Sequence, residues 1–262
     1  MNKNILSNFW LWLTLLVLLV VLIIVKIPAN LAAFVFTKAV PGLSLAEIQG
    51  TFWRGTAGTA LLNVNGDLYS LGKFDWRLKP LSLITMKPCS HVSFIYQNQT
   101  ATGDVCGRDQ RVDLTDFSVN LPATVLDMWV PASLSGELSM MIEEGTLIGN
   151  QVRQMTGNLS WRNGAYHDGA NWIDLGSFGG NLVEDQRGGV NLKLIDLGGP
   201  LIADLDINYN PGLRPNDEYG VALAGEIGVR DSAHRDLQQI VPTVLGTIGE
   251  RSQRGYSFEW QQ

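Results

Sequence analysis

The sequence predicts a mainly β protein. We expect an N-terminal transmembrane helix followed by a duplicated antiparallel meander sheet, strongly curved or half-barrel in shape, with one short covering helix in each half. Three observations predict this fold class: a long uncharged apolar run near the N-terminus, short runs of alternating apolar and polar residues bounded by glycine, and sequence markers that recur in the second half.

The N-terminal run is the strongest local signal. No charged residue lies between Lys3 and Lys26, and Phe9 to Val25 is apolar apart from Thr14. Because about 20 apolar residues cross a bilayer as a helix, residues 5–27 are predicted to be a membrane anchor. A cleaved signal peptide is the alternative, although its apolar core is ordinarily only about 7–15 residues long. Lysines on both sides give no clear charge bias, so a cytoplasmic N-terminus is expected only by analogy with other signal anchors.

Residues 28–47 are predicted to connect the anchor to the domain. Pro28 ends the anchor helix, and Pro41 with Gly42 breaks the next run. Between them, apolar residues recur at near-helical spacing: Leu31, Phe34, Val35 and Val40. A short amphipathic helix fits this pattern, and it either lies near a membrane surface or packs against the domain.

From Leu43 onward the chain reads as strand after strand. Runs that alternate with the period of a half-buried strand include 59–64, 73–78, 91–97, 134–142, 153–161, 201–209 and 221–230. Consecutive antiparallel strands form a meander with one apolar face, which must be covered or curled. We expect two short helices to help cover that face. One spans residues 122–129. The other lies near the C-terminus, with Asp231 as its cap and with Pro242 either as a kink or as its true start.

The markers that recur indicate a duplication. Gly50, Trp53, Arg54, Gly55 and Ala57 are answered by a second box, namely Gly157, Trp161, Arg162, Gly164 and Ala165. Chance is the alternative, since each marker is short. The predicted organisation is a cytoplasmic tail and anchor at 1–27, a connector at 28–47, a first β-module at 48–150 and a second at 151–262. Trp53 and Trp161 are expected at equivalent positions, with Arg54 and Arg162 in structural roles.

Cys89 and Cys106 flank a candidate hairpin and are a candidate disulfide, because the domain is expected to face an oxidising compartment. Free buried thiols and a metal site are the alternatives. A metal site is disfavoured because His91 is the only other suitable ligand nearby.

Composition and motifs argue against several functions. The net charge of −6 lacks the basic footprint of a nucleic-acid groove. No nucleophile elbow, metal-binding histidine pair or phosphate loop is present, so we expect no catalytic residues, no cofactor and no metal. His167 with Asp168 could be a base and its orienting acid, but a solvated turn explains them better, and a solvated sheet face explains Asp204 and Asp206.

The order of these features resembles the type II secretion system protein N family. The resemblance rests on the single anchor, the box at Gly50 to Gly55, the segment Asp75 to Pro80, the cysteine pair and the closing strand after Gly255. It implies a non-enzymatic, single-pass protein of the bacterial inner membrane with a cytoplasmic N-terminus and a periplasmic domain. The implied partners are inner-membrane platform, pseudopilus or secretin components.

The family also resembles AsmA-like proteins, whose curled sheets are associated with lipid transfer. That relation implies phospholipid as a further partner and lipid binding or transfer as the alternative function.

Overall fold

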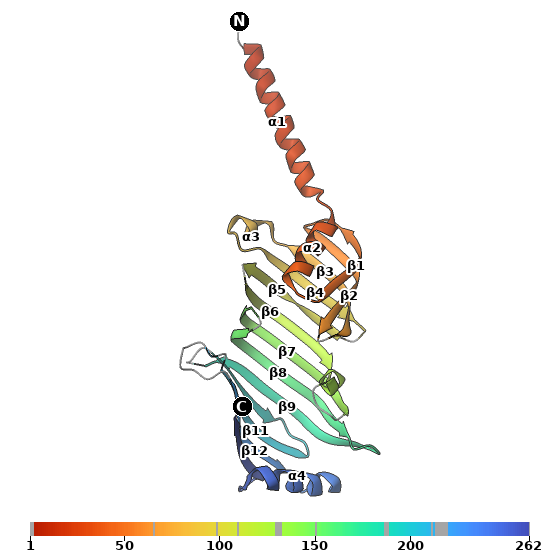
Figure 1. Cartoon of the computed structure of the whole chain (residues 1–262), viewed down its shortest axis with the longest axis vertical. Coiled ribbons are helices and arrows are strands. Elements are labelled where there is room, and N and C mark those ends of the chain that lie inside the picture. Colours follow the sequence, from red (N-terminus) through yellow and green to blue (C-terminus); the bar gives the residue numbers. More distant parts are fainter. Residues whose placement is uncertain are drawn as a thin grey trace. The chain divides into compact units, whose positions relative to one another are not determined.

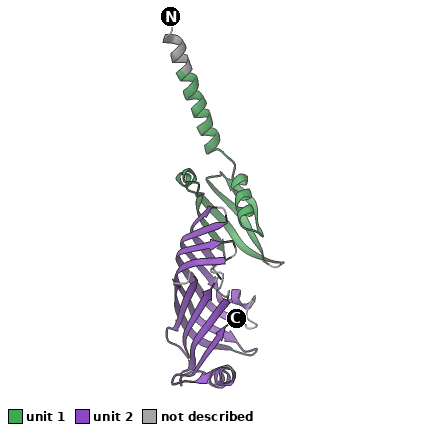
Figure 2. Ribbon diagram, turned by 60° about the vertical axis from the view of Figure 1, so that its left-hand side comes forward, with its two compact units in different colours: residues 1–97 green, residues 98–262 purple. Residues whose placement is uncertain are grey.

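The computed structural model describes residues 3–64, 66–97, 99–108, 110–128, 133–149, 151–185, 189–210, 212 and 220–261. The chain divides into two compact units, residues 1–97 and 98–262, which Figure 2 colours separately. The chain is mainly β, as predicted, although the first unit has as many residues in helices as in strands. Each is described by itself below.

The first unit contains three helices and a four-stranded antiparallel sheet among its described residues. The helices are α1 (Lys3–Val25), α2 (Ala29–Ala39) and α3 (Pro80–Ile84). The strands follow chain order across the sheet as β1 (Leu43–Gly50), β2 (Arg54–Val64), β3 (Asp67–Leu78) and β4 (Cys89–Tyr96). This is the predicted meander (Figure 1).

The N-terminal apolar run is helical, as α1 shows. Its apolar side chains from Trp10 to Val25 are exposed. Within the described part of the chain, no helix is both long and apolar enough to cross a bilayer. The transmembrane assignment of residues 5–27 is therefore not supported by the structure.

The connector forms α2, which packs on the sheet of the first unit through its smallest side chains. Ala29, Ala32 and Ala33 are buried, because alanines allow a close approach of helix to sheet. Phe36 adds an edge-on contact to Phe74 with 5.3 Å between ring centroids. The connector helix therefore packs against the domain, but through its alanines and Phe36. The predicted apolar stripe lies on the other side, exposed to solvent: Leu31, Phe34, Val35 and Val40.

The second unit continues the antiparallel pattern. Its strands are β5 (Gln99–Arg108), β6 (Arg111–Pro122), β7 (Ser133–Ile148), β8 (Gln151–His167), β9 (Trp172–Glu184), β10 (Val190–Asp196), β11 (Leu201–Asn210), β12 (Gly220–Val229), β13 (Glu250–Arg251) and β14 (Tyr256–Gln261). They lie in chain order except that β14 pairs with β12 and β13 follows at the edge. Among the described residues no pairing joins this edge back to β5, so the sheet of this unit is open.

Two helices accompany this sheet. The first is a 3-10 helix, η1 (Ala123–Met128), and the expected residue Trp129 lies outside the described residues. The second is α4 (Arg235–Ile248), which buries Leu237 and Leu245 and packs against β12 and β14 (Figure 1). The predicted cap was wrong: His234, not Asp231, caps α4. Pro242 lies inside the helix rather than at its start.

The two Trp-Arg boxes do not occupy equivalent positions, so the predicted equivalence is wrong. Trp53 lies in the turn between β1 and β2, whereas Trp161 lies inside β8. The local arrangement of Trp161 instead matches that of Trp76 in β3. Each indole lies against a glycine that has no room for a Cβ, each donates Nε1 to a backbone carbonyl, and each has a phenylalanine ring 5.6 Å away.

The module boundary predicted between residues 150 and 151 falls between β7 and β8. These strands pair along most of their lengths within one compact unit. The unit boundary instead follows residue 97. In each box a glycine lies against a tryptophan ring: Gly55 against Trp76, which is outside the first box, and Gly164 against Trp161.

Candidate binding face of the second unit

The register of the second unit builds an apolar row that crosses nine strands. Residues directly opposite each other on antiparallel strands share one face of the sheet. Following these pairs from strand to strand gives Ala101, Val119, Met140, Leu159, Gly180, Leu194, Leu205, Gly225 and Phe258. The row contains no charged or polar side chain.

Two further rows lie on the same face, two residues along each strand. One comprises Phe117, Ile142, Gly157, Leu182, Leu192, Ile207, Leu223 and Trp260. The other comprises Leu121, Leu138, Trp161 and Phe178, and it ends at Asp196, the partner of Phe178 on β10. We call the three rows the apolar face. Every member of the first row is half-buried, so the described chain covers the centre of this face only in part. In the other two rows Ile142, Phe178 and Leu182 are buried, so the face also forms part of the core of this unit. An apolar surface that is only partly covered is a candidate contact site.

The opposite face of the same sheet is mainly polar. The row one residue along from the first contains Ser118, Met141, Asn158, Asn181, Lys193, Asp206, Ala224 and Glu259. Its neighbours are linked by side-chain hydrogen bonds, such as Ser139 Oγ donating to Asn120 Oδ1 at 2.8 Å. Asp204 and Asp206 lie on this face, which agrees with a solvated sheet face rather than a paired-carboxylate site.

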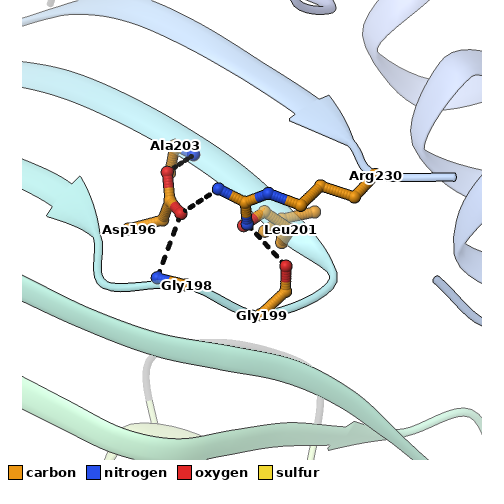
Figure 3. A network of polar contacts seen from close by, with 6 residues as sticks. All are labelled: Asp196, Gly198, Gly199, Leu201, Ala203 and Arg230. Carbon is orange, nitrogen blue, oxygen red and sulfur yellow. Dashed lines mark hydrogen bonds and ion pairs between the residues drawn. The ribbon is translucent and has the colours of Figure 1, made fainter. Parts of the chain in front are cut away.

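An ion pair fixes one end of the face (Figure 3). Arg230, just after β12, donates from one terminal nitrogen to Asp196 Oδ1 at 2.6 Å and from the other to the carbonyl oxygens of Gly199 and Leu201. Asp196 also accepts hydrogen bonds from the amides of Gly198 and Ala203. Partial burial alone would raise the pKa of Asp196, but the Arg230 guanidinium and these two amides outweigh it and hold that pKa below its usual value.

Replacing Asp196 by asparagine is expected to destabilise the second unit by about 1–2 kcal/mol at neutral pH. Hydrogen bonds to charged groups contribute about 1.5–3 kcal/mol, and the lower figure here reflects the partial exposure of Arg230. Because the pKa of Asp196 is lowered in the folded state, this stabilisation is present above the pKa of the unfolded carboxyl and is lost as pH falls through the folded pKa. Urea denaturation should therefore show a difference at pH 7 that shrinks in acid. Asp204→Asn, on the polar face, is the control and should change little at either pH.

The predicted tryptophans and arginines have structural contacts. Trp161 belongs to the apolar face and donates Nε1 to the Ser135 carbonyl at 3.0 Å. Arg162 points away from it and pairs with Glu137 at 2.7 Å, where both side chains are exposed.

In the first unit, Trp53 donates Nε1 to the carbonyl of Ile24 at 2.8 Å. The exposed Arg54 lines a pocket of about 490 Å³, together with Trp76, Arg77 and His91. The hydrogen bond from Trp53 to Ile24 ties the turn between β1 and β2 to the end of α1.

The segment with His167 and Asp168 is a hydrogen-bonded turn. Asp168 Oδ1 accepts hydrogen bonds from the amides of Ala170 and Asn171, each at 2.7 Å, and these amides lower the pKa of Asp168. His167 Nδ1 accepts from the Gly169 amide, and its ring meets Trp172 edge-on. Both side chains therefore bond to their own turn, as the solvated-turn interpretation predicts.

Neither cysteine is free, since both Cys89 and Cys106 are disulfide-bonded. This confirms the disulfide and removes the alternatives of free thiols and a metal site at these residues. Among the described residues, no cluster of three or more candidate ligands could hold a metal ion.

Replacing Cys89 and Cys106 together by serine is expected to lower the free energy of unfolding by about 3 kcal/mol, which is the chain-entropy value for a loop of this size. Urea denaturation of the wild type and the double variant measures the difference. The wild type in excess reductant should behave like the double variant, and an unchanged midpoint in both would contradict the prediction.

The sequence model of the family described as type II secretion system (T2SS), protein N, matches residues 41–258. The chain belongs to this family. The type II secretion system protein N of Vibrio cholerae serotype O1 is 26% identical over 208 residues, which cover 75% of this chain and 77% of the relative. No solved structure matches. The predicted relation to AsmA-like proteins stays a prediction.

The region that matches the T2SS protein N family includes nearly the whole apolar face and begins after α2. Sequence reasoning expected one apolar face but could not name its rows, because bulges between Ile142 and Glu144 and between Trp161 and Gly164 shift the register. It missed the pair of Asp196 and Arg230. The sequence does place an aspartate at the end of one predicted strand and an arginine at the end of another, and this was the feature that could have indicated the pair.

Proposed function

We propose that this member of the T2SS protein N family is an accessory inner-membrane subunit that takes part in protein export across the outer membrane through periplasmic protein contacts. Family membership over residues 41–258 carries the proposal. Family membership supports a role as a component of a type II secretion system. The inner-membrane location and the periplasmic contacts go beyond it and are what we propose.

Membrane attachment in this proposal is by the N-terminal apolar run. The absence of charge between Lys3 and Lys26 and the exposure of the apolar side chains of α1 support it. A single-pass arrangement with a cytoplasmic N-terminus and a periplasmic bulk belongs to the proposal and rests on the sequence.

The apolar face is the proposed contact surface. It is half-buried at its centre and carries no charge in its first row, whereas the reverse face is polar. Such a surface suits an apolar segment of another secretion component, whether of the inner-membrane platform, the pseudopilus or the secretin.

Deletion of the gene and its restoration test the role in export. We expect exported proteins to accumulate in the periplasm of the deletion strain and to return to the medium when the full chain is supplied. Pseudopilus and secretin assembly are followed in the same strains. Normal export and assembly without the chain would contradict the proposal.

Lipid binding is the second candidate, favoured by the uninterrupted apolar row from Ala101 to Phe258. An acyl chain needs a continuous apolar surface without charge, which this row provides. Mass spectrometry of the purified full chain distinguishes the two candidates. A stoichiometric phospholipid that is lost in a Leu159→Asp variant supports lipid binding, and a lipid-free wild-type protein that still restores export removes it.

A further inference from the structure

Three large apolar side chains project from the connection between β3 and β4. Leu81 and Ile84 lie on the short helix α3, and Met86 follows it; each is 78% exposed. We call these three residues the α3 cluster. Leu83 between them is 38% exposed, and no residue of α3 is buried.

The α3 cluster is presented by an ordered turn. Ser82 Oγ donates to the Lys79 carbonyl at 2.6 Å and accepts from the Cys89 amide at 2.8 Å, and the Ser82 carbonyl accepts from Thr85 Oγ1 and the Lys87 amide. Met86 has a backbone φ of 52°, which residues other than glycine rarely adopt. The chain therefore holds these apolar side chains outward with a network of hydrogen bonds.

Two hydrogen bonds through Trp53 link the end of α1 to the end of β3, the strand that leads into α3. Trp53 Nε1 donates to the Ile24 carbonyl at 2.8 Å, and the Trp53 carbonyl accepts from the Leu78 amide at 2.8 Å. Leu78 ends β3, and α3 begins at Pro80. The end of α1 and the helix α3 thus lie at the same end of the first unit (Figure 1).

We propose that the α3 cluster inserts into the surface of the lipid bilayer to which α1 attaches the chain. This inference rests on the membrane attachment in the proposed function. Apolar side chains enter the boundary between headgroups and acyl chains, and adjacent lysines favour anionic lipids. Lys79 and Lys87 flank the cluster; both also have contacts within the chain, so the three apolar side chains carry the inference.

The cluster acts as a second contact with the bilayer beside α1. Attachment through α1 alone leaves the first unit free to turn about the axis of that helix, whereas a second contact restricts the orientation of its sheet relative to the bilayer. The proposed occupant is therefore a lipid surface, and a protein partner at the same residues is the competing outcome.

Photo-cross-linking of the full chain tests this inference. The chain is reconstituted in vesicles of phosphatidylethanolamine and phosphatidylglycerol, with a photoreactive amino acid in place of Ile84. Leu68 is the matched control, because it is 66% exposed but lies at the other end of β3, roughly 30 Å away at about 3.3 Å per residue. Leu18, 60% exposed in α1, reports on attachment itself.

We expect lipid adducts at Leu18 and Ile84 and only background at Leu68. Adding Leu81→Ser and Met86→Ser should reduce the Ile84 adduct to the Leu68 level while leaving the Leu18 adduct unchanged. Adducts at Leu18 with background at Ile84 overturn the inference and leave attachment standing. Background at both overturns attachment and the inference together. Cross-linking of Ile84 to a protein instead of lipid in intact cells overturns it in favour of a protein interface.

Discussion

Replacing Leu159 by aspartate should reduce protein export at least about tenfold, the change that corresponds to a loss of about 1.4 kcal/mol in binding. Leu159 is half-buried near the middle of the first row, between Met140 and Gly180. A carboxylate there must lose water when an apolar partner covers the face, which costs several kcal/mol. Exported protein in the medium, measured in a deletion strain that carries the variant, gives the effect.

The neighbouring residue supplies the control for this variant. Asn158 lies on the polar face, opposite Met141 and Asn181, so Asn158→Asp adds the same charge on the reverse side of the same strand. It should leave export unchanged. Thermal unfolding of both variants shows whether a loss of export by Leu159→Asp comes with a loss of stability, because Leu159 is already half-buried in the free chain. Equal loss of export in the two variants would contradict the assignment of the apolar face.

Replacing Phe74 by alanine is expected to destabilise the first unit by about 3–5 kcal/mol, as for other buried phenylalanines. Phe74 is 1% exposed and its ring lies 4.6 Å from Phe94, 5.3 Å from Phe36 and 5.6 Å from Trp76. Its removal leaves a cavity between α2 and the sheet. Such a loss is a large part of the 5–15 kcal/mol that stabilises an ordinary domain.

Chemical denaturation of the full chain, followed by near-ultraviolet circular dichroism of the aromatic cluster, measures this loss. Phe34→Ala deletes the same atoms from α2, but Phe34 is 58% exposed and should cost little. A loss for Phe34→Ala as large as that for Phe74→Ala would show that the cluster around Phe74 is not the core of the first unit.

Alternation made the strands predictable from the sequence. Asn158, Leu159 and Ser160 show it directly, since the apolar residue faces one side and its polar neighbours the other. Strand order also followed, because consecutive strands separated by short turns pair with each other. The existence of one apolar face was therefore predicted, although not the residues that form its rows.

The register and the ring contacts could not be predicted. Trp76 lies across from Gly55, and Trp161 lies against Gly164 after a shift in register, so the resemblance between these tryptophans exists only in space. The sequence pairs Trp161 with Trp53 because both precede arginine. Local letters cannot reveal which ring a glycine accommodates.

The packing of the connector, residues 28–47, was also not predictable from the sequence pattern. Helical spacing identified Leu31, Phe34 and Val35 as an apolar stripe, but α2 uses the alanines on its opposite side to pack. Close approach to the sheet favours small side chains, and a pattern search weighted towards large apolar residues passes over them. The exposed stripe was therefore predicted, whereas the packing side was not.

Photo-cross-linking in intact cells tests most directly whether this T2SS protein N family member contacts another secretion component through its apolar face. A photoreactive amino acid replaces Met140 in one strain and Asn158 in another, since these residues lie on opposite faces of neighbouring strands. We predict that Met140 gives an adduct with another subunit of the secretion system and that Asn158 does not. Adducts with the same proteins at both positions, or only with phospholipid at Met140, would contradict that claim.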